Sequence, residues 1–116
     1  MKTHIALQAA VVTMLVAKRP ALAQLPIDWQ LKSDGSIYID MALRADAALV
    51  PQVAAELARA MRGAREHSYE LRQDDGTVTR TFQVEGKPSG VSVEFLACQR
   101  GLPLDEAAVP ESGGGA

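Results

Sequence analysis

The sequence has very few of the side chains on which most catalytic and metal sites depend. There is one cysteine, Cys98, and there are two histidines, His4 and His67. A lone cysteine excludes an intramolecular disulfide framework and a zinc site built on several cysteines. The histidines have no ligand-like spacing to each other or to paired carboxylates, so we expect no metal site. Because no phosphate loop, nucleophile elbow or helical metal motif is present, we also expect no cofactor.

An excess of basic charge and a set of clustered aromatic residues are also missing. The chain has 12 Lys and Arg against 14 Asp and Glu, a net charge of −2. It has one tryptophan, two tyrosines and two phenylalanines, which are scattered along the sequence. The most basic stretch contains Arg59, Arg62, Arg65 and Arg72, and it is interleaved with Glu56, Glu66 and Glu70. Polyanion binding normally needs a basic excess or a stacking platform, so the sequence predicts no nucleic-acid partner.

No uncharged run is long enough to cross a membrane. The longest candidate, between Lys2 and Lys18, has 15 residues, whereas a span needs about 20. The first 23 residues also fit an export signal, in which Ala21-Leu22-Ala23 is the cleavage pattern and the cut follows Ala23. The charges of Lys18 and Arg19 weaken this interpretation, because signal peptides avoid charge near the cut.

The alternative for the same segment is a folded helix. At 100° per residue, Ile5, Ala9, Val12 and Val16 share one face, which we expect to be buried. Cations at its end suit the negative pole of the helix, and Pro20 stops it. We favour this interpretation over the export signal.

In the middle of the chain the spacing of apolar residues changes between a period of two, typical of strands, and one of about 3.6, typical of helices. Residues 27–32 and 37–43 alternate apolar with polar side chains and flank an Asp34-Gly35 turn, which predicts a hairpin with Leu43 in its inward row. Apolar positions from Val50 to Met61 then recur at helical spacing up to Gly63. We expect this helix to begin near Val50, because a start at Asp46 would place Pro51 inside it.

The remainder predicts three further strands, and a turn at Asp74-Asp75-Gly76 joins the first two of them. In residues 67–72 we expect His67, Tyr69 and Leu71 to face inward. In residues 77–85 the inward row contains Val78, Phe82 and Val84, and it is interrupted by Arg80. That arginine predicts either a bulge or a side chain reaching past a sheet edge. Residues 91–97 complete the set, with Val91, Val93, Phe95 and Ala97 as its apolar row.

These elements predict an α+β fold, a two-layer sandwich in the order helix, two strands, helix, three strands. We expect an antiparallel sheet with both helices on one face, since every strand has one apolar and one polar side. Residues 1–102 would form a single domain. Residues 103–116, rich in Pro, Ala, Glu and Gly and carrying Asp105, Glu106 and Glu111, would form a disordered tail. The polar sheet face, to which alternation assigns Tyr38, Gln83 and Glu94, is either solvated or an interface.

One segment resembles a known pattern. The run from Lys18 to Trp29, in which a helix ends in Arg19-Pro20, a loop ends in Leu25-Pro26 and a tryptophan opens a strand, is similar to small uncharacterised actinobacterial proteins. Gly90-Val91-Ser92-Val93-Glu94-Phe95 resembles their closing strand. The resemblance covers residues 5 to 97. It implies a cytoplasmic domain and a folded first helix, and it carries over no activity.

Three hypotheses of function remain. The first is a small cytoplasmic, non-enzymatic domain that binds another protein or itself, because no catalytic set is present and a sheet has two edges that need protection or partners. The second is an exported protein cut after Ala23. The third is an enzyme in which Cys98 is the nucleophile and His67 its base, if the fold brings these two strand-end residues together.

Overall fold

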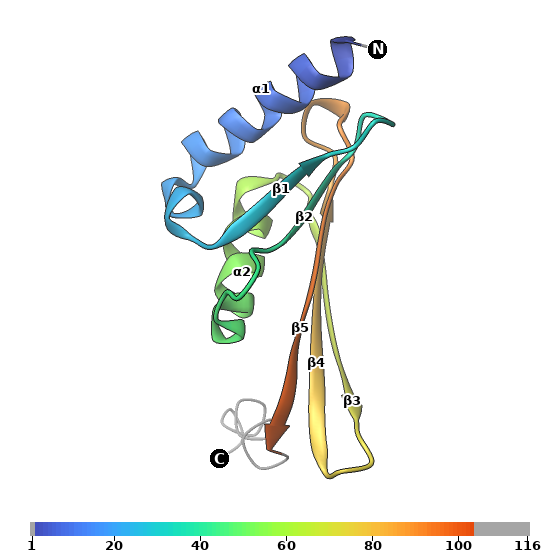
Figure 1. The fold of residues 1–116 in the computed structure, drawn as a ribbon. Coiled ribbons are helices and arrows are strands. Elements are labelled where there is room, and N and C mark those ends of the chain that lie inside the picture. The colour runs from blue at the N-terminus through green and yellow to red at the C-terminus, as the bar shows by residue number, and fades with distance from the viewer. Residues whose placement is uncertain (1, 104–116) are drawn as a thin grey trace.

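The computed structural model describes residues 2–103, which form two α-helices, five strands and three short 3-10 helices (Figure 1). In chain order these are α1 (Lys2–Lys18), η1 (Pro20–Gln24), β1 (Ile27–Leu31), β2 (Ile37–Met41), η2 (Ala47–Leu49), α2 (Val50–Ala60), β3 (Arg65–Arg72), β4 (Thr77–Gly86), η3 (Pro88–Gly90) and β5 (Val93–Pro103). The predicted α+β class and element order are confirmed. Of the predicted tail, Pro103 belongs to β5, and residues 104–116 lie outside the described part of the chain.

The five strands form one sheet in the order β1-β2-β5-β4-β3. The pairs β1/β2, β3/β4 and β4/β5 are antiparallel, whereas β2 and β5 run parallel. The expectation of a wholly antiparallel sheet is therefore wrong at one pair. Strand β5 inserts between β2 and β4, which run in opposite directions. It can therefore be antiparallel to only one of them. A period-two pattern indicates faces, and it contains no information on strand direction.

The core lies between the sheet and two helices that cover one of its faces (Figure 1). Val53 and Leu57 of α2 pack with Val84, Val93 and Phe95 of the central strands, and all five are at most 1 % exposed. Removing a fully buried phenylalanine side chain from such a core costs about 3–5 kcal/mol. Because Phe95 and its neighbours point toward the helices, the residues between them along each strand point to the opposite face.

Helix α1 buries a different face from the predicted one. Val11 and Leu15 are fully buried, whereas Ile5 is 64 % exposed and Ala9 is exposed. The helix is thus turned by roughly 100° from the orientation that its apolar spacing favoured, which is the rotation of one residue. Its apolar residues surround most of the helix, so hydrophobicity alone did not select the buried side. A polar residue, Gln8, marks it instead, at 1 % exposure.

Gln8 connects α1 to the first hairpin. Its side-chain Nε2 donates hydrogen bonds to the carbonyl oxygens of Lys32 at 2.8 Å and Ser36 at 2.6 Å, on the two sides of the turn. Within the turn, Asp34 accepts from the backbone N–H and the hydroxyl of Ser36, which lowers the pKa of Asp34. Gly35 has φ +94°, as the predicted Asp-Gly turn requires. The amide of Gln8 therefore fixes the position of the helix over the hairpin.

An ion pair joins the end of α1 to α2. Arg19 donates from Nε to Oε1 of Glu56 at 2.7 Å and from Nη2 to Oε2 at 3.3 Å, while Arg59 lies 3.7 Å from the same carboxylate. Glu56 is 8 % exposed. The hydrogen bond from Arg19 lowers the pKa of Glu56, because it favours the ionised carboxylate. The bidentate geometry orients the two helices relative to each other.

The loop between β2 and α2 removes Leu43 from the sheet. Strand β2 ends at Met41, and Leu43 is 92 % exposed, so its predicted inward position is wrong. The backbone of Arg44 turns through φ +65°, which ends the alternation. Asp46 then accepts from the N–H of Ala48 and caps η2. Helix α2 begins at Val50, as predicted, with Pro51 in its first turn, where a missing N–H is tolerated.

Strand β3 also departs from expectation. The predicted inward residues pair with β4 residues on the wrong side of the sheet. The pairs are His67 with Gln83, Tyr69 with Thr81 and Leu71 with Thr79, and they lie on the side opposite to Val84 and the core. The predicted inward row is therefore wrong, and it lies on the face away from the helices. All residues of β3 are exposed, so burial did not select its phase. The register follows instead from the tight turn at residues 73–77.

The sheet is irregular beside Arg80, but the extra residue is not in the strand of Arg80, where the interrupted row predicted it. The register between β4 and β5 shifts between Val78 and Arg80, where β5 has one more residue than β4 and Gly101 adopts φ +69°. The bulge is present, with the extra residue in the partner strand. Arg80 donates from Nη2 to Oε2 of Glu70 across the β3/β4 pair at 2.6 Å. Among the described residues, no helix is long and apolar enough to span a membrane.

Replacing Gln8 by Glu tests the link between α1 and the hairpin. An ionised carboxylate has no donor for the two carbonyl groups, so we expect Gln8→Glu to lower the free energy of unfolding at pH 7 by about 3 kcal/mol or more. Chemical denaturation measures this. The control is Gln24→Glu at an exposed position, where we expect a change within about 0.5 kcal/mol. Equal effects of the two variants would show that Gln8 does not hold the hairpin.

Replacing Glu56 by Gln tests the ion pair through pH. Since the pKa of Glu56 is lower in the folded chain than its usual value of 4.5, its contribution is complete above that value and is lost as pH falls through the folded pKa. We expect the stability difference between wild type and Glu56→Gln to be largest at neutral pH and to shrink progressively below pH 4.5. Denaturation curves across this range measure it. Asp74→Asn, in an exposed turn, is the control, and an equal pH dependence there would contradict the assignment.

Candidate functional site

The face of the sheet opposite the helices, here called the open face, contains most of the polar groups that could act on a ligand. Its side chains form rows across the strands. One row joins Tyr69, Thr81 and Cys98, a second joins His67, Gln83 and Leu96, and a third joins Arg65, Glu85, Glu94 and Tyr38. Directly opposed residues on neighbouring strands lie within side-chain contact. The rows therefore show which functional groups the fold brings together.

The two residues of the predicted catalytic pair share the open face but not a row. His67 lies on β3 and Cys98 on β5, with β4 between them, which places the strands about 10 Å apart. The neighbour of Cys98 is Thr81, whose Oγ1 is 3.3 Å from Sγ. Thr81 is 8 % exposed and Cys98 is half-buried. The arrangement provides the thiol with a hydroxyl partner and no imidazole.

The third row forms the most polar part of the open face. Gln83 donates from Nε2 to Oε2 of Glu85 and to Oε2 of Glu94, each at 2.9 Å. One amide thus bridges two carboxylates that oppose each other across β4 and β5. Arg65 on β3 lies opposite Glu85 and adds a positive charge to the row.

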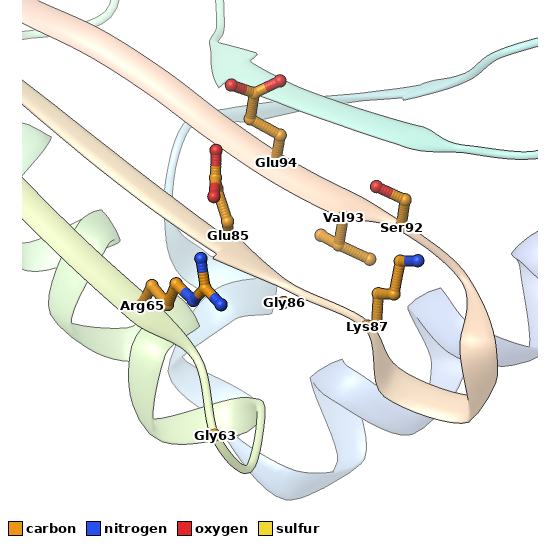
Figure 2. A pocket seen from close by; sticks show the side chains of 8 residues that line it. All are labelled: Gly63, Arg65, Glu85, Gly86, Lys87, Ser92, Val93 and Glu94. Carbon is orange, nitrogen blue, oxygen red and sulfur yellow. The ribbon is translucent and has the colours of Figure 1, made fainter.

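A hollow of about 500 Å³ lies at the end of this row (Figure 2). Its charged lining consists of Arg65 and Lys87 on one hand and Glu85 and Glu94 on the other, and the hydroxyl of Ser92 is beside them. The volume is within the range of small-molecule sites, although such sites are mostly apolar. This hollow is balanced in charge and offers ionic contacts of both signs.

A second hollow of about 410 Å³ continues along the open face and shares Ser92 and Glu94 with the first. Tyr38 lines it. Burial raises the pKa of the Tyr38 phenol, and the nearby carboxylates of Asp40 and Glu94 raise it further. Lys32 Nζ lies 5.6 Å from the centre of the Tyr38 ring, within range of a cation–π contact. Neither histidine lines either hollow, so Ser92 has no imidazole base there.

The sequence placed part of this site correctly. Alternation assigned Gln83, Glu94 and Tyr38 to the polar face, and the structure confirms those positions. Arg65 and Lys87 were missed, because they border strand ends, where no alternation marks a face. That Glu85 opposes Glu94 follows from strand order, which the sequence does not contain.

The other groups considered in the sequence have structural roles. Asp75 accepts from the backbone N–H and the hydroxyl of Thr77, which lowers the pKa of Asp75, and this is the same turn chemistry as at Asp34. Glu70 pairs with Arg80. His4 lies against Gly35 of the first hairpin. Within residues 2–103, no group of three or more His, Cys, Asp or Glu side chains is placed to hold a metal ion.

Comparison of the chain with protein-family models, with curated proteins and with solved structures gives no match in any of the three. The resemblance to small actinobacterial proteins stays a prediction. The geometry of the open face is therefore the basis for any functional assignment.

The neighbourhood of Cys98 gives a prediction about thiol chemistry. We expect His67→Ala to leave the rate at which Cys98 reacts with a thiol reagent unchanged within about twofold, because β4 separates the two residues. Thr81→Val removes the adjacent hydroxyl and should slow the reaction about fivefold, the equivalent of one hydrogen bond of about 1 kcal/mol. Both rates are measured on the folded chain at neutral pH. A large fall of the reaction rate in His67→Ala, together with an unchanged rate in Thr81→Val, would contradict this prediction and support the pair of Cys98 and His67.

Proposed function

We propose that this chain is a small cytoplasmic, non-enzymatic domain that works by binding protein, either another chain or a second copy of itself, through strand β3. One observation carries the proposal. β3 is an edge strand of eight residues, all of them exposed, with Tyr69 at 57 % and Leu71 at 63 % exposure on the open face. Exposed aromatic and aliphatic side chains on a free sheet edge are typical of a strand that accepts a partner.

The two edges of the sheet differ in a way that favours β3 as the binding edge. The other edge strand, β1, has five residues, most of which are half-buried. β3 pairs with β4 over its full length without a bulge, and it contains neither lysine nor proline. Proteins commonly place bulges, lysine or proline in an edge strand to prevent it from pairing with another chain. Because β3 has none of these three, its edge can accept a further strand.

The cytoplasmic, uncut form of the chain is part of the proposal. Val11, Leu15 and Leu22 are at most 2 % exposed and belong to the core. A cut after Ala23 would remove all three, together with the bonds of Gln8 and Arg19. The sheet would then lose one of its two covering helices. These contacts favour the intact chain over the exported form.

Exchanging one exposed leucine for aspartate tests the binding edge. We expect the purified full-length chain to associate, with itself or with a partner from native extract, and we expect Leu71→Asp to weaken that association at least tenfold. Leu43→Asp is the matched control, since Leu43 is 92 % exposed in a loop away from β3. Light scattering and co-purification measure the two forms of association.

Two results would overturn the proposal. A strict monomer that retains no partner from native extract would contradict a binding function. An association that Leu71→Asp and Leu43→Asp reduce equally would place the contact elsewhere.

A further inference from the structure

We infer that the partner of β3 is a second copy of this chain, which pairs antiparallel with it around a twofold axis at Tyr69 and joins two sheets into one of ten strands. The inference rests on the proposed function and names its partner. It follows from the backbone of β3 and from the order of charges along it.

The backbone first restricts which pairings are possible. The N–H of Gln73 donates to the carbonyl of Thr77 at 2.8 Å, so Gln73 directs its peptide groups toward β4. Peptide groups of alternate residues point to the same side of an antiparallel strand. Since β3 pairs with β4 without a register shift, odd-numbered residues bond to β4. The even-numbered residues direct their N–H and C=O groups to the free edge, namely Glu66, Ser68, Glu70 and Arg72.

A symmetric partner must therefore place even-numbered residues opposite even-numbered residues. This condition is met when the twofold axis passes through a residue, and it fails when the axis lies between two residues. An axis at Ser68 or at Tyr69 pairs seven of the eight residues of β3, whereas an axis at residue 67 or 70 pairs five and an axis at residue 71 pairs three. The two axes that pair most of β3 are therefore at Ser68 and Tyr69.

Charge distinguishes between these two registers. An axis at Ser68 places Glu66 opposite Glu70 of the second copy. Like charges directly opposed across strands are destabilising. An axis at Tyr69 instead places Glu66 opposite Arg72, and symmetry makes this pair twice. Within the described part of the chain, neither Glu66 nor Arg72 forms an ion pair of its own.

The same register also matches the apolar side chains. Tyr69 faces its own copy, and Leu71 faces His67, all on the open face. Tyr69 and Leu71 are odd-numbered, so these are the non-hydrogen-bonded pairs, in which side chains approach most closely. Aromatic pairs at such positions stabilise a sheet. The two exposed large hydrophobic side chains of β3 are thereby covered, Tyr69 by its own copy and Leu71 by His67 of the second copy.

Charge reversal provides the first test of this register. We expect wild type to be a dimer, and we expect Glu66→Arg or Arg72→Glu alone to weaken it about tenfold or more, since each change turns two attractive pairs into two repulsive ones. The double variant Glu66→Arg/Arg72→Glu should return to within about threefold of wild type. Arg62→Glu, an exposed arginine outside β3, is the control and should have little effect. Sedimentation measures the dissociation constants, and far-UV circular dichroism checks folding.

Mixing the two single variants sharpens the test. One carries Arg at 66 and 72 and the other Glu at both, so the Tyr69 register predicts that the mixture forms heterodimers although neither variant dimerises alone. The alternative axes predict no such rescue, because they do not oppose residues 66 and 72. A mixture that stays monomeric would overturn the register.

A cross-link locates the twofold axis directly. In a Cys98→Ser background, we expect Tyr69→Cys to form a disulfide-linked dimer under mild oxidation, because the two copies of position 69 are opposite each other. Leu71→Cys, equally exposed on the same face, should not cross-link, since its copies are offset by four residues, about 13 Å along the strand. Cross-linking of Leu71→Cys without cross-linking of Tyr69→Cys would contradict the assignment.

The outcomes separate this inference from the proposed function. If wild type is a monomer that binds a different protein, and Leu71→Asp loses this binding whereas Leu43→Asp keeps it, the partner is not a second copy. That result overturns the present inference and leaves β3 as the binding edge. A dimer indifferent to both charge reversals overturns the register. A monomer without any partner overturns both proposals.

Discussion

The insertion of β5 between the two hairpins is the constraint on which the rest of the structure depends. Val93 and Phe95 lie at the centre of the sheet, at most 1 % exposed, and pack beneath both helices. Because β5 occupies the middle, β4 lies beside it and β3 is left at the edge. The burial of β5 thus determines both the core and which strand is exposed. The hydrophobic effect drives the burial of β5, and the edge position of β3 follows from the connectivity of the chain.

The two layers are held together differently at their two ends. Toward the first hairpin, polar contacts from Gln8 and the Arg19–Glu56 pair orient helices whose apolar surface alone would not define an angle. Toward the second hairpin, β3 and β4 continue past α2, and none of the described helices covers them there (Figure 1). Cross-strand contacts such as Glu70–Arg80 support this part of the sheet. Ion pairs near the surface contribute little stability, so this part of the sheet is supported mainly by backbone pairing.

The open face combines two kinds of surface along its length. Near the start of β5, charges of both signs surround a hollow, and one glutamine bridges two carboxylates (Figure 2). Near the second hairpin, Tyr69 and Leu71 of β3 are large hydrophobic side chains exposed on this face. An apolar strand edge bordered by polar groups is an arrangement typical of protein interfaces. The two surfaces meet at Arg65, which belongs to β3 and also lines the hollow.

The sequence by itself determined the α+β class, the element order, both Asp-Gly turns and the inward rows of β2 and β5, because alternation and turn chemistry are local. It placed Gln83, Glu94 and Tyr38 on the polar face for the same reason. It did not determine the parallel pairing of β2 with β5, the buried side of α1 or the phase of β3. Those depend on contacts between segments distant in sequence, and for β3 on the exposure of all its residues, which leaves its phase to the turn and to pairing with β4. Only the tertiary structure placed Thr81 beside Cys98 and left Tyr69 and Leu71 on a free edge.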